Sequence, residues 1–231
     1  MLLAAGRGER LRPLTDRVPK ALVEVGGKPL IAWHLERLAA SGLREAVINV
    51  AHLGEQIVEA IGDGSRFGLR IAYSREPEPL ETAGGIAFAR PLLSGQPFLL
   101  VNADVYCEYD FRRLLGRSLA SPAGPTLLAH LVLVPNPAHR PGGDFDLDGA
   151  RVSGGAERRR YTYAGVALMS PALVAGVRPG DKAPLAPLLY QAAERGLLSG
   201  EVYEGLWQDV GTAARLAELE SLLASRTHET R

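Results

Sequence analysis

Cysteine is nearly absent from this chain, and histidine is sparse and scattered. The 231 residues include one cysteine, Cys107, so no disulfide can form within the chain. A chain of this kind fits a reducing compartment, and we expect a cytoplasmic protein. The histidines do not have the short spacings of a zinc site. They are His34, His52, His130, His139 and His228.

An excess of one charge and long apolar runs are also missing. Lysine and arginine together number 26, as do aspartate and glutamate, so nothing suggests a global field for nucleic acid or a membrane surface. No apolar run reaches the roughly twenty residues that cross a bilayer. Residues 1–5 are too short for the core of a signal peptide. We expect a soluble monomer with its functional charge gathered at one local site.

Familiar catalytic and nucleotide-binding patterns are absent as well. No Gly-x-Ser-x-Gly elbow and no cysteine–histidine pairing offers a protein nucleophile. The glycines at 6 and 8 do not begin a dinucleotide fingerprint, because position 11 is Leu11 where the third glycine belongs. No Gly-Lys-Ser/Thr follows, as a P-loop requires. Any phosphate site in this chain is therefore of another kind.

The start of the chain nevertheless has the composition of a polyphosphate-binding loop. A short apolar strand runs into two glycines, Gly6 and Gly8, and then into two cations, Arg10 and Lys20. Glycines let the backbone approach a ligand closely, and successive N–H groups can bind an anion. Taken alone, the Gly-x-Gly turn is equally typical of a strand that simply reverses into a helix.

Strand and helix patterns alternate in the first half of the chain and then give way to hairpins. The continuously apolar run 97–101 is typical of a strand covered on both faces of a parallel sheet. Strand patterns lie at 2–4, 46–50, 69–73, 97–101, 126–134 and 161–169, with a hairpin around an Asp-Gly turn at 146–152 and a short element at 201–205. Helix patterns lie at 30–42, 55–61, 86–89, 186–195 and 213–223.

These patterns predict an α/β fold of the Rossmann-like kind. We expect a mixed, mainly parallel sheet flanked by helices, with an antiparallel addition from the second half of the chain. A length of 231 residues suits one domain, divided into parts at about 1–115 and about 116–231. The first strand, at 2–4, is short.

Two aspartates stand where ligands collect in such a fold. Asp104 follows the apolar strand 97–101, and open α/β sheets bind ligands beyond the carboxyl ends of their strands. Asp209 lies in the segment 207–212, just before a predicted helix. Both are also ordinary positions for an aspartate that caps a turn or a helix.

The segment 78–86 has two adjacent glycines after a threonine. Gly84 and Gly85 could let a flat base lie against the backbone, whose N–H and C=O groups would then bond its edge. The same residues could instead form the start of a helix, with Thr82 as its cap and the glycines packed on the sheet.

Several segments form one composite pattern. Residues 3–30, 78–86, 101–104 and 207–212 together resemble the sugar-1-phosphate nucleotidyltransferase family, and the resemblance extends over nearly the whole chain. Glu81 stands where many members have the glycine of Leu-Gly-Thr. In this replacement the chain resembles the N-acetylmuramate-1-phosphate uridylyltransferase branch of the family. The segments 62–69, 97–102, 129–134 and 143–145 resemble the same branch.

The resemblance implies which residues form the site. Nucleotide contacts are expected from Ala4, Ala5, Gly6, Gly8, Glu9, Arg10, Lys20, Tyr73, Thr82 and Gly84. Contacts to the acceptor sugar are expected from Asn102, Asp144, Tyr163 and Gly165. Mg²⁺, which prefers oxygen ligands, would be held by Asp104 and Asp209. The catalytic residues implied are Arg10, Lys20 and Asp104.

The reaction implied by the resemblance is nucleotidyl transfer. A sugar 1-phosphate attacks the α-phosphate of a nucleoside triphosphate in line and expels pyrophosphate, so catalysis rests on positioning and charge neutralisation. We expect uridylyl transfer from UTP to N-acetylmuramate 1-phosphate in cell-wall sugar recycling. The alternative is transfer of a guanylyl or another nucleotidyl group to mannose, heptose or another sugar 1-phosphate. A catalytically silent relative is disfavoured, because Arg10, Lys20 and both aspartates are present.

A few residues bear on the acceptor and on departures from the family pattern. Ala83 and Ala103 replace glycines that relatives usually have, and each adds a methyl group beside a ligand. The lactyl carboxylate of N-acetylmuramate needs a cation or donor, which His139, Arg140 or the arginines at 158–160 could supply. Such an arginine run is more typical of a solvated surface loop.

Overall fold

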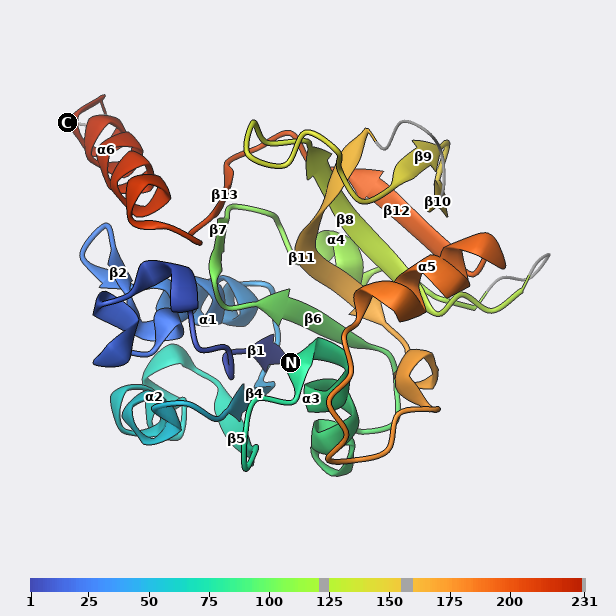
Figure 1. Cartoon of the computed structure of the whole chain (residues 1–231), viewed down its shortest axis with the longest axis horizontal. Helices are drawn as coiled ribbons and strands as arrows, with labels where there is room; N and C mark the ends of the chain where they lie inside the picture. The colour runs from blue at the N-terminus through green and yellow to red at the C-terminus, as the bar shows by residue number, and fades with distance from the viewer. Residues whose placement is uncertain (121–124, 155–159, 230–231) are drawn as a thin grey trace.

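One continuous sheet organises the molecule. The computed structural model describes residues 1–120, 125–154 and 160–229, and within them nine strands pair in the order β5-β4-β1-β6-β11-β8-β12-β10-β9. Figure 1 shows the strands of the second half of the chain continuing the sheet beyond β6. The nine strands are β1 (Leu2–Leu3), β4 (Glu45–Val50), β5 (Arg70–Arg75), β6 (Phe98–Asn102), β8 (Ala129–Pro135), β9 (Asp146–Asp148), β10 (Arg151–Ser153), β11 (Tyr161–Met169) and β12 (Leu198–Val202).

Strand direction divides the sheet at the β6–β11 boundary. The pairs β5–β4, β4–β1 and β1–β6 are all parallel. Beyond them β11 lies antiparallel between β6 and β8, and the β9–β10 hairpin closes the far edge. The predicted mixed sheet, parallel in its first half with an antiparallel addition, is confirmed.

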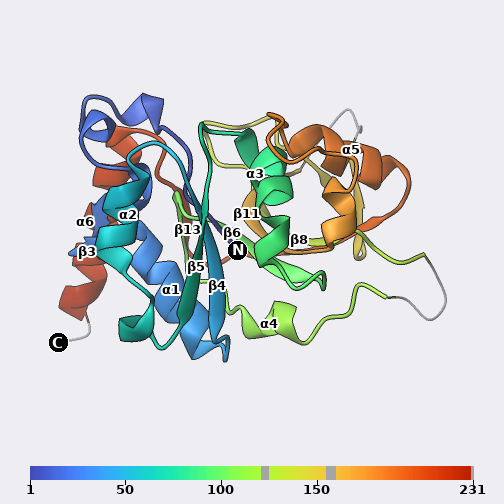
Figure 2. The same ribbon diagram turned by 90° about the horizontal axis from the view of Figure 1, so that it is seen from below.

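Helices cover both faces of this sheet. Figure 2 shows α1 and α2 on one side of β4 and β5 and α3 on the other. The longer helices are α1 (Leu30–Ala40), α2 (Gly54–Ile61), α3 (Glu81–Ala89), α5 (Ala186–Glu194) and α6 (Ala213–Glu229), with a one-turn helix α4 at Arg112–Leu115. Within the described residues, no helix has the length and apolar character needed to span a membrane.

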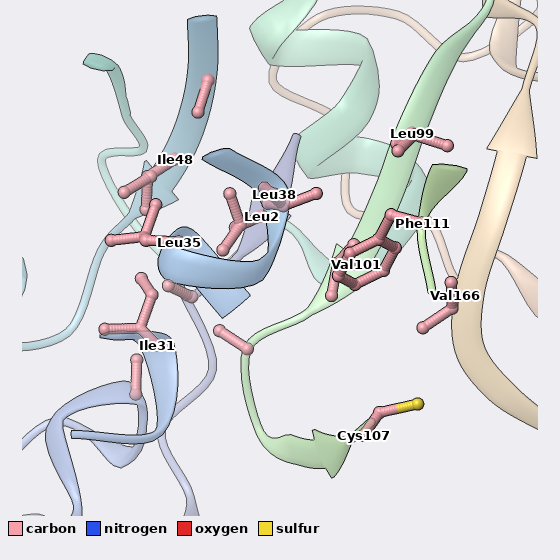
Figure 3. Packing of buried hydrophobic residues seen from close by; sticks show 14 of the residues in the cluster. Leu2, Ile31, Leu35, Leu38, Ile48, Leu99, Val101, Cys107, Phe111 and Val166 are labelled. Atoms are coloured by element: carbon pink, nitrogen blue, oxygen red, sulfur yellow. The ribbon is translucent and has the colours of Figure 1, made fainter. Parts of the chain in front are cut away.

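The strand alternation explains why two cores form. Val101 and Val166 face the core beneath α1 and α2, whereas their neighbours Leu100 and Ala167 face the core beneath α3 and α5. Because side chains alternate across a strand, an unbroken apolar run fills both cores at once. Figure 3 shows the first core, where Ile31 and Leu35 of α1 approach Leu2 and Ile48 of the sheet.

Two short ribbons lie outside the main sheet. Strand β2 (Glu24–Val25) pairs with β3 (Lys28–Pro29), and β7 (Val105–Cys107) pairs with β13 (Trp207–Asp209). Helix α6 packs through Leu219 into a third core with Val25 and Val210. This packing fixes the segment that carries Asp209.

The start of α3 corrects a prediction. The sequence pattern placed the helix at 86–89 with the threonine–glycine segment before it, but α3 begins at Glu81 and contains that segment. Tertiary contacts extend the helix: the Ala183 carbonyl accepts the N–H groups of Ala83 and Gly84, and a Glu76 carboxylate oxygen accepts the N–H of Leu80. With these first-turn donors satisfied, the helix begins five residues earlier.

Candidate functional site

A cavity of about 520 Å³ lies at the carboxyl ends of β1, β4 and β6. We call it the central cavity. Ten of the residues expected at the site line it: Ala4, Ala5, Gly6, Gly8, Glu9, Arg10, Lys20, Thr82, Asn102 and Asp104. The structure thus brings the glycine-rich loop, the start of α3 and the end of β6 to one place, as the carboxyl-end rule for open sheets predicts.

The glycine-rich loop is folded tightly onto Thr15 and Lys20. Gly8 has a φ of 65°, which glycine adopts without strain. A Cβ atom on Gly8 would come to 2.9 Å from the Thr15 methyl carbon and 3.1 Å from Lys20 Cβ. The Thr15 hydroxyl donates to the Gly8 carbonyl at 2.8 Å. Gly6 is different, because a Cβ atom there would meet nothing within 4 Å.

Lys20 and Asp104 form the ion pair at the centre of the cavity. The Lys20 ammonium donates to Asp104 Oδ2 at 2.6 Å. Lys20 is buried, with 7% of its surface exposed, while the Asp104 side chain is 42% exposed and lines the cavity. The cation is therefore held in place by the protein, and the carboxylate faces space that a ligand can enter.

Asp209 is brought to Asp104 by the β7–β13 ribbon. In the register of this ribbon Asp209 lies opposite Val105, and the Val210 N–H donates to the Asp104 carbonyl at 3.1 Å. Asp209 Oδ2 lies 3.1 Å from Nη1 of Arg215 and 3.6 Å from Nε2 of His139. The backbone contacts put the two aspartates side by side although 105 positions separate them in the sequence.

The donor set fits a magnesium ion that is shared with phosphate. Asp104 lines the central cavity, whereas Asp209 lines a neighbouring cavity together with His139 and Trp207. The two cavities meet at Gly211, because a Cβ atom on this residue of the central wall would lie 2.8 Å from Asp209 Oδ1. Within the described residues, no group of three or more metal-ligating side chains occurs. Two carboxylates leave most of an octahedral coordination sphere to phosphate oxygens and water, the usual arrangement for Mg²⁺.

Arg10 approaches the same corner. A Cβ atom on Gly211 would come to 2.9 Å from Nη2 of Arg10 and would overlap the guanidinium of Arg215. The missing side chain of Gly211 therefore lets two cations and Asp209 meet at the cavity wall. Like charges this close favour a bound anion between them.

Two residues expected near the base lie away from the central cavity. The Tyr73 hydroxyl donates to the Gly62 carbonyl at 2.6 Å on the outer side of β5. Gly84 is buried within α3, where a Cβ atom would overlap the Asp181 carbonyl. The absence of a side chain at Gly84 thus serves the packing of α3 against the segment that precedes α5.

The residues expected to contact the sugar form a neighbouring cluster. Gly165 lies against Asn102, with its Cβ position 2.8 Å from the side-chain amide nitrogen. Asp144 is buried, accepts the N–H of Tyr163 at 2.9 Å and pairs with Arg140. The Tyr163 hydroxyl is buried without a hydrogen-bond partner among the described residues, and burial raises its pKa. Asn102 joins this cluster to the central cavity.

The cations considered for the lactyl carboxylate are mostly paired. Arg140 pairs with Asp144, Arg160 pairs with Asp146 at 2.6 Å, and His139 approaches Asp209. Arg158 and Arg159 lie outside the described residues.

Several side chains that shape the site were not predicted from the sequence. Asn49 and Gly211 line the cavity, Glu76 lies buried behind it, and Arg215 pairs with Asp209. Glu81, singled out only as a departure from the family pattern, also lines the wall. Asn49 is the one polar residue in the predicted strand 46–50, a feature visible in the sequence that could have marked it. Glu76 directly follows β5, but the predicted strand ended at 73, so its position at a strand end was not visible in the sequence.

Comparisons with known proteins agree with this geometry. The nucleotidyl transferase family profile matches residues 1–140, and the chain belongs to this family. Over 228 residues it is 51% identical to the N-acetylmuramate alpha-1-phosphate uridylyltransferase of Neisseria meningitidis serogroup B, covering 96% of both chains. It is also 31% identical to the mannose-1-phosphate guanylyltransferase catalytic subunit beta of Danio rerio, covering 91% of this chain and 60% of the relative.

Solved structures confirm the fold. A putative glucose-1-phosphate thymidylyltransferase from Bacillus anthracis superposes with a TM-score of 0.81 at 19% identity, covering 96% of this chain and 93% of that one. HddC from Yersinia pseudotuberculosis, in complex with GMP-PN, gives a TM-score of 0.75 at 23% identity, covering 96% and 97%. The predicted nucleotidyltransferase fold is therefore confirmed.

Proposed function

We propose that this enzyme transfers a uridylyl group from UTP to N-acetylmuramate 1-phosphate, giving UDP-N-acetylmuramate and pyrophosphate. The observation that carries the proposal is the 51% identity, over 96% of both chains, to a protein named for this activity. The site supports it, because Lys20, Arg10 and Asp104 line one cavity, Asp209 lies behind the Gly211 wall of that cavity, and Asn102 joins the cavity to Gly165. The same relative favours a role in peptidoglycan recycling.

The residues of the cavity fit an in-line displacement. An oxygen of the sugar phosphate forms a bond to the α-phosphorus while the bond to the β-phosphate oxygen breaks, and pyrophosphate leaves with that electron pair. The acceptor is already an anion, so no general base is needed. Lys20 neutralises charge on the α-phosphate and the sugar phosphate, Arg10 binds the leaving pyrophosphate, and loop N–H groups near Gly6 and Gly8 hold the remaining oxygens.

Asp104 and Asp209 hold Mg²⁺ in this proposal. When bound, the ion supplies charge neutralisation between the α-phosphate and the acceptor phosphate. The Lys20–Asp104 pair keeps the carboxylate oriented toward the cavity. Asn102 and Asp144 contact the acceptor sugar, with Tyr163 and Gly165 on its far side. The enzyme acts as a cytoplasmic monomer.

Guanylyl transfer is the second candidate. It is favoured by the 31% identity to a mannose-1-phosphate guanylyltransferase subunit, which covers 91% of this chain. The phosphate loop and the two aspartates serve either nucleotide. Only the α3 start and the Asn102–Gly165 cluster can distinguish them.

A substrate matrix tests the proposal. Purified protein with Mg²⁺ is assayed for pyrophosphate release with UTP, GTP, CTP, ATP and dTTP against the 1-phosphates of N-acetylmuramate, N-acetylglucosamine, mannose and heptose. We expect the highest kcat/KM for UTP with N-acetylmuramate 1-phosphate. A preference for GTP would transfer the assignment to the second candidate. Equal rates with N-acetylglucosamine 1-phosphate would rule out recognition of the lactyl group.

A further inference from the structure

A buried chain of hydrogen bonds passes behind the central cavity. The Ala4 N–H donates to Asn49 Oδ1 at 2.8 Å, and Asn49 Nδ2 donates to Glu76 Oε1 at 2.6 Å. The other carboxylate oxygen, Oε2, accepts the Leu80 N–H at 3.0 Å. This chain links the ends of β1, β4 and β5 to the start of α3. We call it the Asn49–Glu76 bridge.

Glu76 is an unusual residue to bury. It is 6% exposed, and no ion pair to it occurs within the described residues. Both carboxylate oxygens accept hydrogen bonds, and the N-terminus of α3 adds a favourable dipole. Burial nevertheless raises its pKa, since moving a carboxylate out of water is costly. A neutral side chain would cap α3 with a smaller penalty.

Both ends of the bridge reach the wall of the cavity. Ala4 and Asn49 line the cavity beside the phosphate loop, and Leu80 immediately precedes Glu81 and Thr82, which line the opposite wall. The bridge therefore connects, through three hydrogen bonds, the two walls that a nucleoside triphosphate has to touch.

Glu81 shows that the second wall is held under constraint. Its φ is 60°, a conformation that costs a residue other than glycine about 1–2 kcal/mol. Such backbone geometry persists only where neighbours fix it. The bond from Leu80 to Glu76 on one side and the Ala83 bond to the Ala183 carbonyl on the other fix Glu81 between them.

Gly85 makes room for the bridge. A Cβ atom on Gly85 would come to 2.6 Å from Glu76 Oε1 and 2.7 Å from Asn49 Nδ2. Gly85 was expected to let a base lie against the backbone. In the structure, its missing side chain instead leaves room for these two polar side chains.

We propose that Asn49 and Glu76 are positioning residues that fix the distance between the phosphate loop and the Glu81–Thr82 wall, and so preform the cavity for a nucleoside triphosphate. The proposal rests on the proposed nucleotidyl transfer. A ligand that touches both walls gains affinity from the bridge, because the protein does not have to order the walls on binding. A ligand that touches only the phosphate loop gains little.

The test swaps the two side chains. In Glu76→Gln one of the two acceptor oxygens becomes an NH₂ group, which cannot accept from Asn49 or from Leu80. In Asn49→Asp the donor to Glu76 becomes a second carboxylate. Each single variant therefore loses one hydrogen bond of the bridge. The double variant Asn49→Asp/Glu76→Gln restores it: the new carboxylate accepts from Ala4 and from the new amide, whose oxygen accepts from Leu80. Binding of UTP and of pyrophosphate is measured by calorimetry with Mg²⁺, without acceptor, together with kcat, KM and the melting temperature.

We expect each single variant to weaken UTP binding and raise the KM for UTP about tenfold or more, the scale of a small misplacement at a site. Pyrophosphate binding should change little, and the double variant should recover most of the UTP affinity. Gly85→Ala is a second perturbation that changes no polar group and should reproduce the loss. His130→Gln, a buried polar change on β8 in the other half of the sheet, is the control for general destabilisation.

The proposal is overturned if the single variants bind UTP as the wild type does, or if they lose UTP and pyrophosphate affinity equally. It is also overturned if the double variant binds no better than the singles. These outcomes compare the variants with the wild type in ligand binding alone, so they do not depend on which sugar 1-phosphate the enzyme uses. If the substrate matrix shows another triphosphate to be preferred, that triphosphate replaces UTP and the comparison is unaffected.

Discussion

Lys20 is a buried ammonium paired with a carboxylate that faces the cavity, and this asymmetry defines what each can do. The lysine cannot leave its place, so an incoming phosphate meets a fixed positive charge. Preorganised charge of this kind is usually the largest contribution to catalysis in phosphoryl transfer. The pair is consequently the first place to separate catalysis from folding.

We predict that Lys20→Ala and Asp104→Ala each lower turnover by about 10²–10³-fold or more, the scale for loss of one electrostatic stabiliser. The fold should survive in both variants, because Asp104 is exposed enough to be hydrated when Lys20 is removed. Asp104→Ala leaves the buried Lys20 ammonium unpaired, so this variant should also melt at a lower temperature. Pyrophosphate release measures turnover, and circular dichroism with thermal melting measures the fold. Normal pyrophosphate release by either variant would refute the role of that residue.

Gly6 and Gly8 belong to one loop but should respond differently to alanine. A methyl group on Gly6 meets nothing within 4 Å, so Gly6→Ala should leave the melting temperature unchanged while weakening triphosphate binding, because the methyl occupies space next to the phosphates. Gly8→Ala should lower the melting temperature as well, since Gly8 has a φ of 65° and lies against Thr15. Unchanged UTP affinity in Gly6→Ala would show that phosphate does not approach this glycine.

The residues that the sequence predicted best are those at the ends of apolar strands. Asp104 and Asn102 could be placed at the cavity because strand ends in an open α/β sheet share one edge. Tyr73 and Gly84 could not be placed from the pattern. A shift of one residue along a strand, or of one turn along a helix, changes the direction in which a side chain points. Their positions followed from partners distant in sequence, Gly62 and Asp181.

At the scale of elements, the β7–β13 ribbon carries the second aspartate. Its anchor is Trp207, whose indole N–H donates to the Ala164 carbonyl at 2.9 Å. Two residues further on, the same strand ends in Asp209. Each strand of the ribbon is only three residues long, so few hydrogen bonds hold it in place. The loss of the Trp207 bond should therefore loosen the position of Asp209.

We predict that Trp207→Phe raises the Mg²⁺ concentration needed for half-maximal activity, because Asp209 loses its fixed position. The lost hydrogen bond should also cost about 1–2 kcal/mol of stability. Ser41→Ala is the control: its hydroxyl donates to the Leu38 carbonyl at 2.7 Å at the end of α1, so it also loses one side-chain bond to a backbone carbonyl, but outside the ribbon. Equal shifts in Mg²⁺ dependence for both variants would show that the ribbon does not position the metal ligand.

Helix α3 shows why element boundaries were harder to predict than element types. The glycine-rich sequence argues against a helix at 81–85, since glycine is a poor helix former. Its first turn forms because Glu76, four residues before Leu80, and the Ala183 carbonyl, from a segment far away in sequence, accept its N–H groups. The local pattern contains Glu76 but not Ala183.

At the scale of the molecule, the parallel half of the sheet could be predicted and the strand order of the other half could not. Helices between β1, β4, β5 and β6 force parallel neighbours. By contrast, β11 is inserted between β6 and β8, and β12 pairs in parallel with β8. These pairings connect strands remote in sequence, and nothing in the alternation of apolar residues specifies which strand is the neighbour.

Two buried histidines make the whole molecule sensitive to acid. Burial, with the nearby Arg117 charge, lowers the pKa of His130 to about 4, and burial lowers the pKa of His34 to about 4. In the unfolded chain histidine titrates near 6.5. Between these pH values the two histidines are protonated in the unfolded chain but stay neutral in the folded protein. The free energy of unfolding therefore falls as the pH drops from about 6.5 toward 4. The raised pKa of Glu76 acts in the opposite direction.

We predict that the free energy of unfolding decreases as the pH drops from about 7 toward 4, each histidine contributing on the order of 3 kcal/mol by pH 4. Urea unfolding at pH 7.5, 6.0 and 5.0 measures the decrease. His130→Gln removes one titrating group while keeping a polar side chain beside Ser199, so its stability should fall less steeply with pH than that of the wild type. Parallel curves for the two proteins would mean that His130 takes up its proton in the folded state, and that the buried His130–Ser199 contact tolerates the charge.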